Sequence, residues 1–236
     1  MRHYVLTRSA FGPAWDLDAN RRRLAVTRAV TAPLMAAQTA RAWTWVVLLD
    51  ERDPLLAERM ALYRASAPAF LPLVWRPEVE GNPSRIAAAD YRAPWRSMLG
   101  PADDQVLTTR LDDDDGFAPD ALARYQAAAR RLRRRTVLML PVGVRVWAGR
   151  YSLVRHDRNA MHTLVSPPGD AMCVYDYGHV QCQRVAPVLT VDRVPGWLWV
   201  RHRDTISGWR EGKRPIDPFI RRLFPADWPA LAEAWR

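Results

Sequence analysis

The chain has 236 residues, of which 49% are hydrophobic, and this is enough for one domain of ordinary size with its own core. Two cysteines, Cys173 and Cys182, exclude a disulfide framework and a four-thiolate metal site. No apolar run approaches the roughly 18 residues of a membrane span, and the first eight residues hold no apolar stretch of signal-peptide length. We therefore expect a soluble, intracellular protein.

The formal net charge of +10 and the sequence pI near 10.5 favour attraction to polyanions, which include nucleic acid, an anionic membrane surface and phosphate-bearing substrates. Lys213 is the only lysine among 35 basic residues, a bias typical of GC-rich coding. The one dense basic run, residues 130–135, falls where a helix is expected to end, and there it complements the helix dipole. The net charge alone therefore does not indicate which of these polyanions the protein binds.

The first half of the chain alternates strand and helix patterns. Residues 43–49 form a continuous apolar run closed by Asp50, which is typical of a parallel strand buried on both faces. Thr31 and Pro33 predict a restart inside a helical region, because Thr can cap a helix and Pro suits its first turn. In chain order, the predicted elements are a strand at 4–7, helix at 18–38, strand at 43–49, helix at 57–65, strand at 70–75, a helical region at 84–99 broken at Pro94, and a strand at 105–110.

The second half begins with a helix and then becomes rich in short strands. Pro119 is expected in the first turn of a helix whose apolar stripe repeats at helical spacing. Strand-like pieces follow at 137–140, 144–147 and 172–175, and the tail, 215–236, predicts two short amphipathic helices that pack on the body. We predict an α/β fold with a mostly parallel sheet, and a functional boundary near residue 140.

Four aspartates, Asp112, Asp113, Asp114 and Asp115, follow the strand at 105–110 directly. In an α/β sheet, ligands collect outside the carboxyl ends of the strands, so these carboxylates stand where chemistry is expected. Closely packed like charges repel one another, and a bound cation is the natural compensation. Oxygen ligands suit Mg²⁺ or Mn²⁺, which complete their shells with water and substrate phosphate. A solvated acidic turn that caps the next helix is the alternative interpretation.

The sequence around these aspartates, residues 106–122, resembles the strand, D-x-D-D turn and helix of GT-A glycosyltransferases. Residues 32–50 resemble the helix ending in Gln-Thr and the following strand with a terminal acidic residue in the same enzymes. Together with Thr109-Arg110-Leu111-Asp112, the late segment 197–202 resembles a bacterial rhamnosyltransferase family. The resemblance covers roughly residues 1–210. It implies a GT-A, Rossmann-like nucleotide-diphospho-sugar transferase fold with helices on both faces of the sheet, as one domain over residues 1–236.

The resemblance also implies roles for particular residues. Asp112 and Asp114 correspond to the D-x-D pair, with Asp112 and Asp113 on the nucleotide and with Asp114 or Asp115 on the metal. The late histidine, His202, is a candidate third metal ligand. The residues that the resemblance places in the nucleotide pocket are Thr7, Arg8 and Asp50. Arg85 is a further candidate, because an arginine beside a helix start can meet diphosphate oxygens bidentately.

An inverting reaction would need a carboxylate that deprotonates the acceptor hydroxyl from the far side of the sugar. Asp176 is our first candidate for this catalytic base, because it closes the predicted strand at 172–175. Asp157, Asp170 and Asp192 remain competitors. We therefore predict that residues 1–140 bind the nucleotide sugar and that residues 141–236, with the C-terminal helices, bind the acceptor.

The sequence thus predicts a metal-dependent glycosyltransferase of the hexosyltransferase type. The resemblance implies deoxythymidine diphosphate rhamnose (dTDP-rhamnose) as donor and a glycan or another hydroxyl compound as acceptor. We expect a place in the bacterial cytoplasm, with peripheral association at the inner face of the membrane left open. The alternatives are a metal-dependent nuclease or nucleic-acid-binding protein, a phosphohydrolase using Asp112, and a lectin-like module. Nucleic acid is the weaker expectation, because neither a zinc-finger spacing nor an RNA-binding aromatic motif is present.

Overall fold

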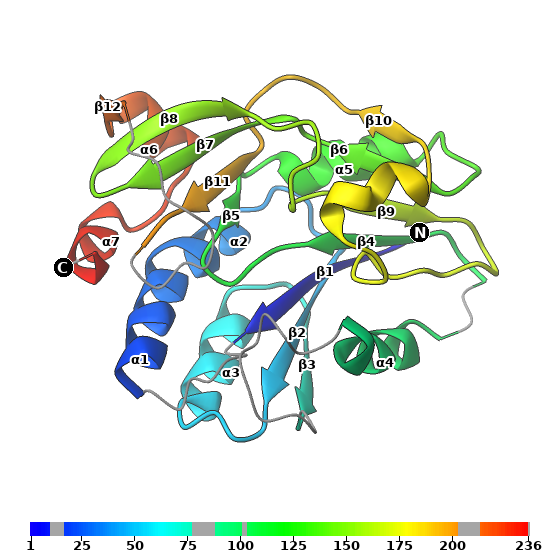
Figure 1. Cartoon of the computed structure of the whole chain (residues 1–236), viewed down its shortest axis with the longest axis horizontal. Coiled ribbons are helices and arrows are strands. Elements are labelled where there is room, and N and C mark those ends of the chain that lie inside the picture. The colour runs from blue at the N-terminus through cyan, green and yellow to red at the C-terminus, as the bar shows by residue number, and fades with distance from the viewer. Residues whose placement is uncertain (10–16, 77–87, 101–102, 203–212, 236) are drawn as a thin grey trace.

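The computed structural model describes residues 1–9, 17–76, 88–100, 103–202 and 213–235, with the side chains of 88–91 left aside. It contains two sheets, with helices packed around and between them (Figure 1). The termini lie on different sides of the molecule, the N-terminus at the start of β1, an inner strand of the large sheet, and the C-terminus beside α7.

The large sheet has seven strands in the order β10-β6-β9-β4-β1-β2-β3. Neighbours pair in parallel except around β9, which is antiparallel to both β4 and β6. The strands are β1 (Arg2–Ser9), β2 (Thr44–Asp50), β3 (Phe70–Trp75), β4 (Val106–Arg110), β6 (Thr136–Met139), β9 (Thr163–Ser166) and β10 (Val188–Thr190). The predicted α/β class with a mostly parallel sheet is confirmed.

Helices cover both faces of this sheet, as predicted. On one face, Trp45 and Val47 of β2 pack with Tyr63 of α3 and Tyr125 of α5. On the other, Val46 and Leu48 share a core with α4 and with the 3-10 helix η2. These helices are α3 (Leu56–Ala65), α4 (Ala88–Leu99), α5 (Ala121–Ala129) and η2 (His179–Arg184).

The second sheet has five strands in the order β12-β8-β7-β11-β5. Its strands are β5 (Gly116–Phe117), β7 (Val142–Trp147), β8 (Arg150–Arg155), β11 (Trp197–Val200) and β12 (Arg214–Pro215). A continuous helical stretch, α1 (Leu17–Val26), the π-helix η1 (Thr27–Thr31) and α2 (Ala32–Ala36), packs against it together with the tail helices α6 (Pro218–Leu223) and α7 (Trp228–Ala234).

The tail helices pack on the body, as expected, because Ile220, Phe224, Trp228 and Leu231 are buried in the core of the second sheet. Within the described residues, every helix is too short or too polar to cross a bilayer. The large sheet draws its last strands from beyond residue 135, and the functional division near residue 140 stays a prediction.

The predicted restart at Thr31 is confirmed in position, since α2 begins at Ala32 directly after the π-helix, with Pro33 in its first turn. The hydroxyl of Thr31 does not cap α2, because it bonds to the distant carbonyl of Asp113 instead.

Two other predictions of local structure are wrong. Pro94 does not break α4, because burial of Trp95 and Leu99 on the sheet holds the following turn in place. Residues 172–175 form a loop rather than a strand, because their apolar side chains fill the core without pairing to a neighbour.

Candidate active site

The carboxyl ends of β1 and β4 lie side by side at the centre of the large sheet (Figure 1). β1 also pairs with β2, so the strand order reverses here, which is the place in an α/β sheet where ligands generally bind. β4 ends at Arg110 and runs into the acidic turn, residues 112–115, which leads to β5. The fold therefore places the four aspartates at the topological switch point.

The backbone of the acidic turn is held by the helical stretch beneath it. Thr27 and Thr31, four residues apart in η1, both donate their hydroxyl hydrogens to the carbonyl oxygen of Asp113, at 2.7 and 3.0 Å. Gly116 follows the turn, and a Cβ at this position would lie 2.2 Å from Cδ1 of Leu34 in α2. The turn can pass so close to α2 only because residue 116 has no side chain.

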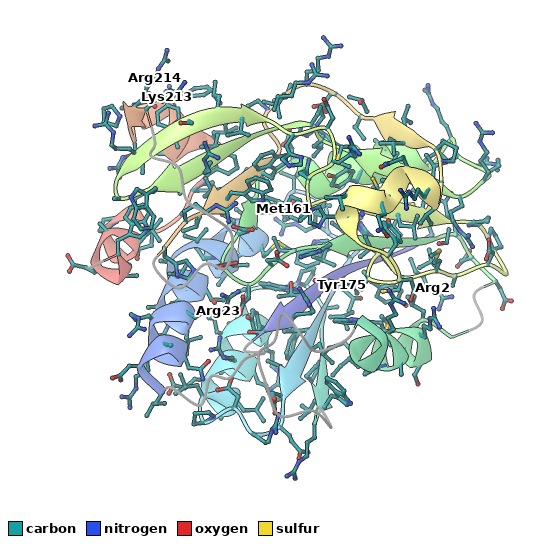
Figure 2. The ribbon with its side chains drawn as sticks, in the orientation of Figure 1. Arg2, Arg23, Met161, Tyr175, Lys213 and Arg214 are labelled. Atoms are coloured by element: carbon teal, nitrogen blue, oxygen red, sulfur yellow. The ribbon has the colours of Figure 1, made fainter. Side chains whose placement is uncertain are left out.

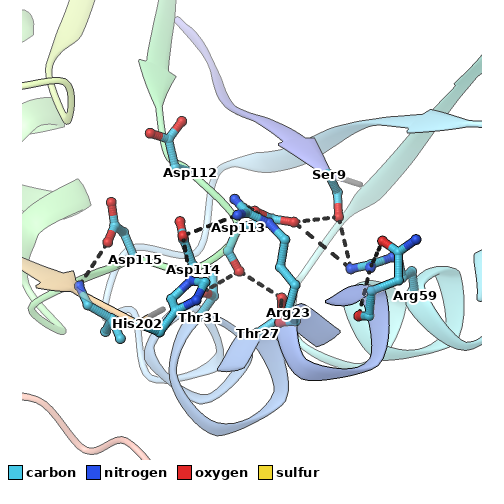
Figure 3. A network of polar contacts seen from close by, with 12 residues as sticks. Ser9, Arg23, Thr27, Thr31, Arg59, Asp112, Asp113, Asp114, Asp115 and His202 are labelled. Atoms are coloured by element: carbon cyan, nitrogen blue, oxygen red, sulfur yellow. Dashed lines mark hydrogen bonds and ion pairs between the residues drawn. The ribbon is translucent and has the colours of Figure 1, made fainter. Parts of the chain in front are cut away.

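Asp113 points into the protein (Figure 3). Its side chain is completely buried and accepts hydrogen bonds from Nε of Arg23 at 2.7 Å and from Oγ of Ser9 at 2.9 Å. Arg59, also completely buried, lies 3.9 Å away and pairs with Asp53 at 2.6 Å. Asp113, predicted to contact the nucleotide, thus has both carboxylate oxygens engaged inside the protein.

Asp114 lies beside His202, which follows β11. The distance from Nε2 of His202 to Oδ2 of Asp114 is 3.1 Å, and Arg23 lies 3.4 Å from the same oxygen. Burial favours the neutral acid, but Arg23 and the hydrogen bond with His202 outweigh it and lower the pKa of Asp114 to about 2. The structure therefore brings together two of the predicted metal ligands, with Asp114 ionised.

Asp115 is buried and accepts a hydrogen bond from the backbone N–H of Val200 at 3.0 Å. Burial and the nearby charges of Asp114 and Asp112 raise the pKa of Asp115 well above its ordinary value. A cation beside these carboxylates would reverse that effect, because it favours the ionised form.

Asp112 is the most exposed side chain of the acidic turn, at 30%, and it points away from Asp113 (Figure 3). Its carboxylate accepts hydrogen bonds from Arg110 at 3.1 to 3.3 Å. Burial acts to raise the pKa of Asp112, but the charges of Arg110 and Arg8 prevail and lower it. Asp112 is therefore an ionised carboxylate that a ligand can reach.

The remaining predicted nucleotide contacts lie in different surroundings. The hydroxyl of Thr7 is buried and accepts the indole N–H of Trp45 at 2.9 Å. Asp50, at the end of β2, is buried and accepts two hydrogen bonds from the guanidinium of Arg52, at 2.9 and 3.0 Å. Arg8 is half-buried at the end of β1, and Arg85 lies outside the described residues.

Asp176, the first candidate for the catalytic base, lies in the loop after β9 rather than at a strand end. It accepts hydrogen bonds from Nε of Arg96 and from the backbone N–H of Cys173, both at 3.0 Å. Its competitors are paired as well: Asp157 with Arg155, Asp170 with Arg135 and Asp192 with Arg124. The assignment of the base stays a prediction.

Sequence reasoning missed the side chains that support the acidic turn. Ser9, Arg23, Thr27 and Thr31 come from segments between 82 and 104 residues away from Asp113 in the chain. The spacing of Thr27 and Thr31, one helical turn apart, was the only available signal. Arg110 could have been found, because it ends the strand that leads into the turn.

In the described part of the chain, no three His, Cys, Asp or Glu side chains converge in a group that could hold a metal ion. Asp114 and His202 make one close pair, with Asp112 on the outer side of the same turn. Mg²⁺ is commonly held by one or two carboxylates together with substrate phosphates, and such a site needs no complete cage of protein ligands. The donor chemistry therefore fits a metal that arrives with a phosphorylated substrate.

The family described as "Putative rhamnosyl transferase" matches residues 18–214. The chain belongs to this family. Membership confirms the predicted transferase of the glycosyltransferase type, and the large sheet confirms the fold class. A comparison with curated proteins gives no match.

Solved structures with similar folds are distant from this rhamnosyltransferase family member. S. aureus TarS is 15% identical with a TM-score of 0.41, over 62% of this chain, which spans 22% of TarS. The "putative nucleotide-diphospho-sugar transferase from Desulfovibrio desulfuricans G20" is 12% identical with a TM-score of 0.43, over 85% of this chain and 82% of that one. The inositol-1-phosphate CTP transferase from T. maritima is 11% identical with a TM-score of 0.43, over 94% of each chain.

Proposed function

We propose that this glycosyltransferase is metal-dependent and moves a sugar, with rhamnose as the first candidate, from a nucleoside diphosphate donor to a hydroxyl acceptor. The observation that carries the proposal is the acidic turn at the switch point, with Asp112 ionised and accessible and Asp114 paired to His202. The donor sugar rests on the family description, and no described side chain by itself selects a 6-deoxy sugar.

A divalent ion would be held by the pair Asp114 and His202 or by the accessible carboxylate of Asp112, and the donor diphosphate and water would complete its shell. When bound, the ion supplies a positive charge that stabilises the nucleoside diphosphate as it leaves. Asp115 supports the site, because its bond to the backbone of Val200 ties the turn to the strand that precedes His202. Asp113 holds the turn from the inside through Arg23 and Ser9.

The experiment that tests this proposal is a thermal-shift series with dTDP, UDP and GDP, each with and without Mn²⁺. A ligand that binds only the native state raises the melting temperature, by about 5 °C or more at roughly 100-fold excess over its Kd. We expect such a rise for at least one nucleotide, and a larger one with the metal.

Asp112→Asn should remove the metal-dependent part of that shift, because it removes an accessible charge from the proposed ion. Turnover of dTDP-rhamnose should fall by about two orders of magnitude or more, as for other losses of charge stabilisation at a reacting centre. Asp120→Asn is the matched control, since Asp120 is exposed at the start of α5 and outside the turn. An Asp112→Asn protein that responds to Mn²⁺ like the parent would refute Asp112 as a ligand of the metal.

We also propose that the protein associates peripherally with an anionic membrane, through exposed basic side chains at β8, β12 and α6. These are Arg150, Lys213, Arg214, Arg221 and Arg222, and Phe219 of α6 is 53% exposed. Lys213 and Arg214 lie at the end of the second sheet, well separated from Arg23 of the site (Figure 2). Basic side chains around an exposed aromatic ring favour the surface of anionic lipid.

Co-sedimentation with vesicles tests this association. The double variant Arg221→Gln with Arg222→Gln should bind phosphatidylglycerol vesicles roughly thirtyfold more weakly than the parent, since each surface arginine contributes about 1 kcal/mol. The double variant Arg130→Gln with Arg131→Gln removes the same charge from an exposed turn elsewhere and should bind like the parent. Equal losses in both proteins would show that total charge alone governs binding, and a gel shift with duplex DNA would then test the nucleic-acid alternative.

A further inference from the structure

Two arginines at the switch point project from the same face of the large sheet. β1 and β4 are parallel neighbours, with Leu6 opposite Arg110. Because side chains alternate along a strand, Arg8 shares a face with Leu6, and Arg110 shares a face with Val106. Leu6 and Val106 belong to the core cluster that also contains Tyr175, so both arginines emerge where this core reaches the carboxyl ends of the strands.

The guanidinium groups of both arginines lie over the ring of Tyr175. The central carbon of Arg8 lies 5.2 Å from the ring centroid and that of Arg110 lies 5.3 Å from it. Both distances fall within the about 6 Å over which an aromatic face attracts a cation. Two like charges are thereby kept near each other at the ends of adjacent strands, against their mutual repulsion.

Tyr175 is itself fixed from several sides. Its ring stacks on the buried Trp95 of α4, with 5.5 Å between centroids and an angle of 9° between planes. Its hydroxyl donates to the carbonyl of Leu6 at 3.4 Å, and the preceding N–H, of Val174, donates to the hydroxyl of Thr108 at 3.0 Å. The ring is therefore a rigid part of the core, and the position of both arginines depends on it.

The charge around this ring is suited to an anion. Arg110 pairs with Asp112, which neutralises one of the two guanidinium charges. Burial, followed by the charge of Arg110, lowers the pKa of nearby His179 to about 4, so this imidazole is neutral near pH 7. Arg110 keeps 15% of its side chain exposed and Arg8 is half-buried, so neither side chain is closed off from a ligand at the carboxyl ends of β1 and β4.

We propose that Arg8 and Arg110 form a subsite for the two phosphoryl groups of a diphosphate, and that Tyr175 is the positioning residue that sets their geometry. Planar guanidinium groups bind phosphate oxygens bidentately, and a fixed pair matches a diphosphate better than a monophosphate. That the diphosphate belongs to a sugar donor rests on the proposed function. Within this subsite Arg110 pairs with Asp112, whereas Arg23 pairs with Asp113 on the inner side of the turn.

Titration calorimetry with inorganic pyrophosphate, dTDP and dTMP, in the presence of Mg²⁺, tests the subsite. We expect Arg110→Gln and Tyr175→Leu to weaken pyrophosphate and dTDP binding about tenfold or more, with a smaller effect on dTMP. Tyr175→Phe keeps the aromatic face and should restore most of the affinity. Arg64→Gln is the matched control, because Arg64 lies over the ring of Phe70 at 6.0 Å, outside the site, and should bind like the parent.

Melting temperatures of all variants identify losses that come from unfolding, and the ratio of dTDP to dTMP affinity reports the subsite in any variant that remains folded. Binding of dTDP by Arg110→Gln and Tyr175→Leu with parental affinity would overturn the subsite while leaving the proposed function intact. A parent protein that binds pyrophosphate but no nucleoside diphosphate would retain the subsite and refute the proposed function. Failure to bind pyrophosphate or any diphosphate refutes both.

Discussion

The inner and outer sides of the acidic turn hold the same residue type in different surroundings. On the inner side, Asp113 is completely buried among Ser9, Arg23 and Arg59. On the outer side, Asp112 is 30% exposed and pairs with Arg110. The comparison shows that adjacent aspartates in one cluster can divide into a buried anchor and an accessible carboxylate, because a tight turn points successive side chains in different directions.

The largest effect on stability should come from the inner side. Asp113→Asn removes the carboxylate charge that pairs with Arg23, while Arg59 keeps its pairing with Asp53, and we expect a loss of about 3 kcal/mol in the free energy of unfolding. Urea denaturation of both proteins measures this difference. Asp112→Asn should stay within about 0.5 kcal/mol of the parent, and similar losses in the two variants would break the distinction between the two sides.

A second prediction concerns the stability of the protein at acid pH, which depends on a buried histidine near the start of β1. His3 is buried, with Nε2 2.7 Å from the hydroxyl of Thr109 and with Nδ1 3.1 Å from the amide nitrogen of Gln126. Burial lowers the pKa of His3 to about 3, below the value near 6.5 in the unfolded chain. The unfolded state therefore binds a proton first as the pH falls below 6.5, and the folded state loses stability between pH 6.5 and pH 3.

Between pH 7 and pH 5, protonation of His3 in the unfolded chain should lower the free energy of unfolding by about 2 kcal/mol. His3→Gln should remove that part of the pH dependence, as measured by urea denaturation at both pH values, whatever its effect at pH 7. His156→Gln, at a half-buried histidine bonded to the backbone of Arg158, serves as the control. An unchanged pH dependence in His3→Gln would show that His3 is protonated in the folded protein.

The smallest expected effect on stability concerns the hydrogen bonds that hold the backbone of the acidic turn. Thr31→Val removes one of the two hydroxyl donors to the carbonyl of Asp113, and the second, from Thr27, remains. We expect a loss of about 1 kcal/mol, the typical net contribution of one hydrogen bond, measured by urea denaturation. Thr39→Val, at an exposed threonine in the loop after α2, should change stability by less than half of that. Equal effects would mean that the hydroxyl of Thr31 does not support the turn.

The alternation of strands and helices, and the place of the acidic turn after β4, could be predicted from local sequence patterns alone. Residues 43–49 show why, because an unbroken apolar run ending at an acidic residue is a local pattern that needs no knowledge of its neighbours. The loop at 172–175 shows the limit, because its apolar side chains are equally compatible with a strand and with a buried loop that holds Tyr175 in the core.

Which aspartate of the acidic turn points to the inner side and which to the outer side depends on the tertiary structure. The partners of Asp113 come from β1, α1 and α3, and the partner of Asp114 follows β11, 88 residues further along the chain. Four identical residues in a row carry no local signal for these contacts. The sheet order that brings β1 beside β4, together with the burial it creates, fixes the charge and the exposure of each side chain.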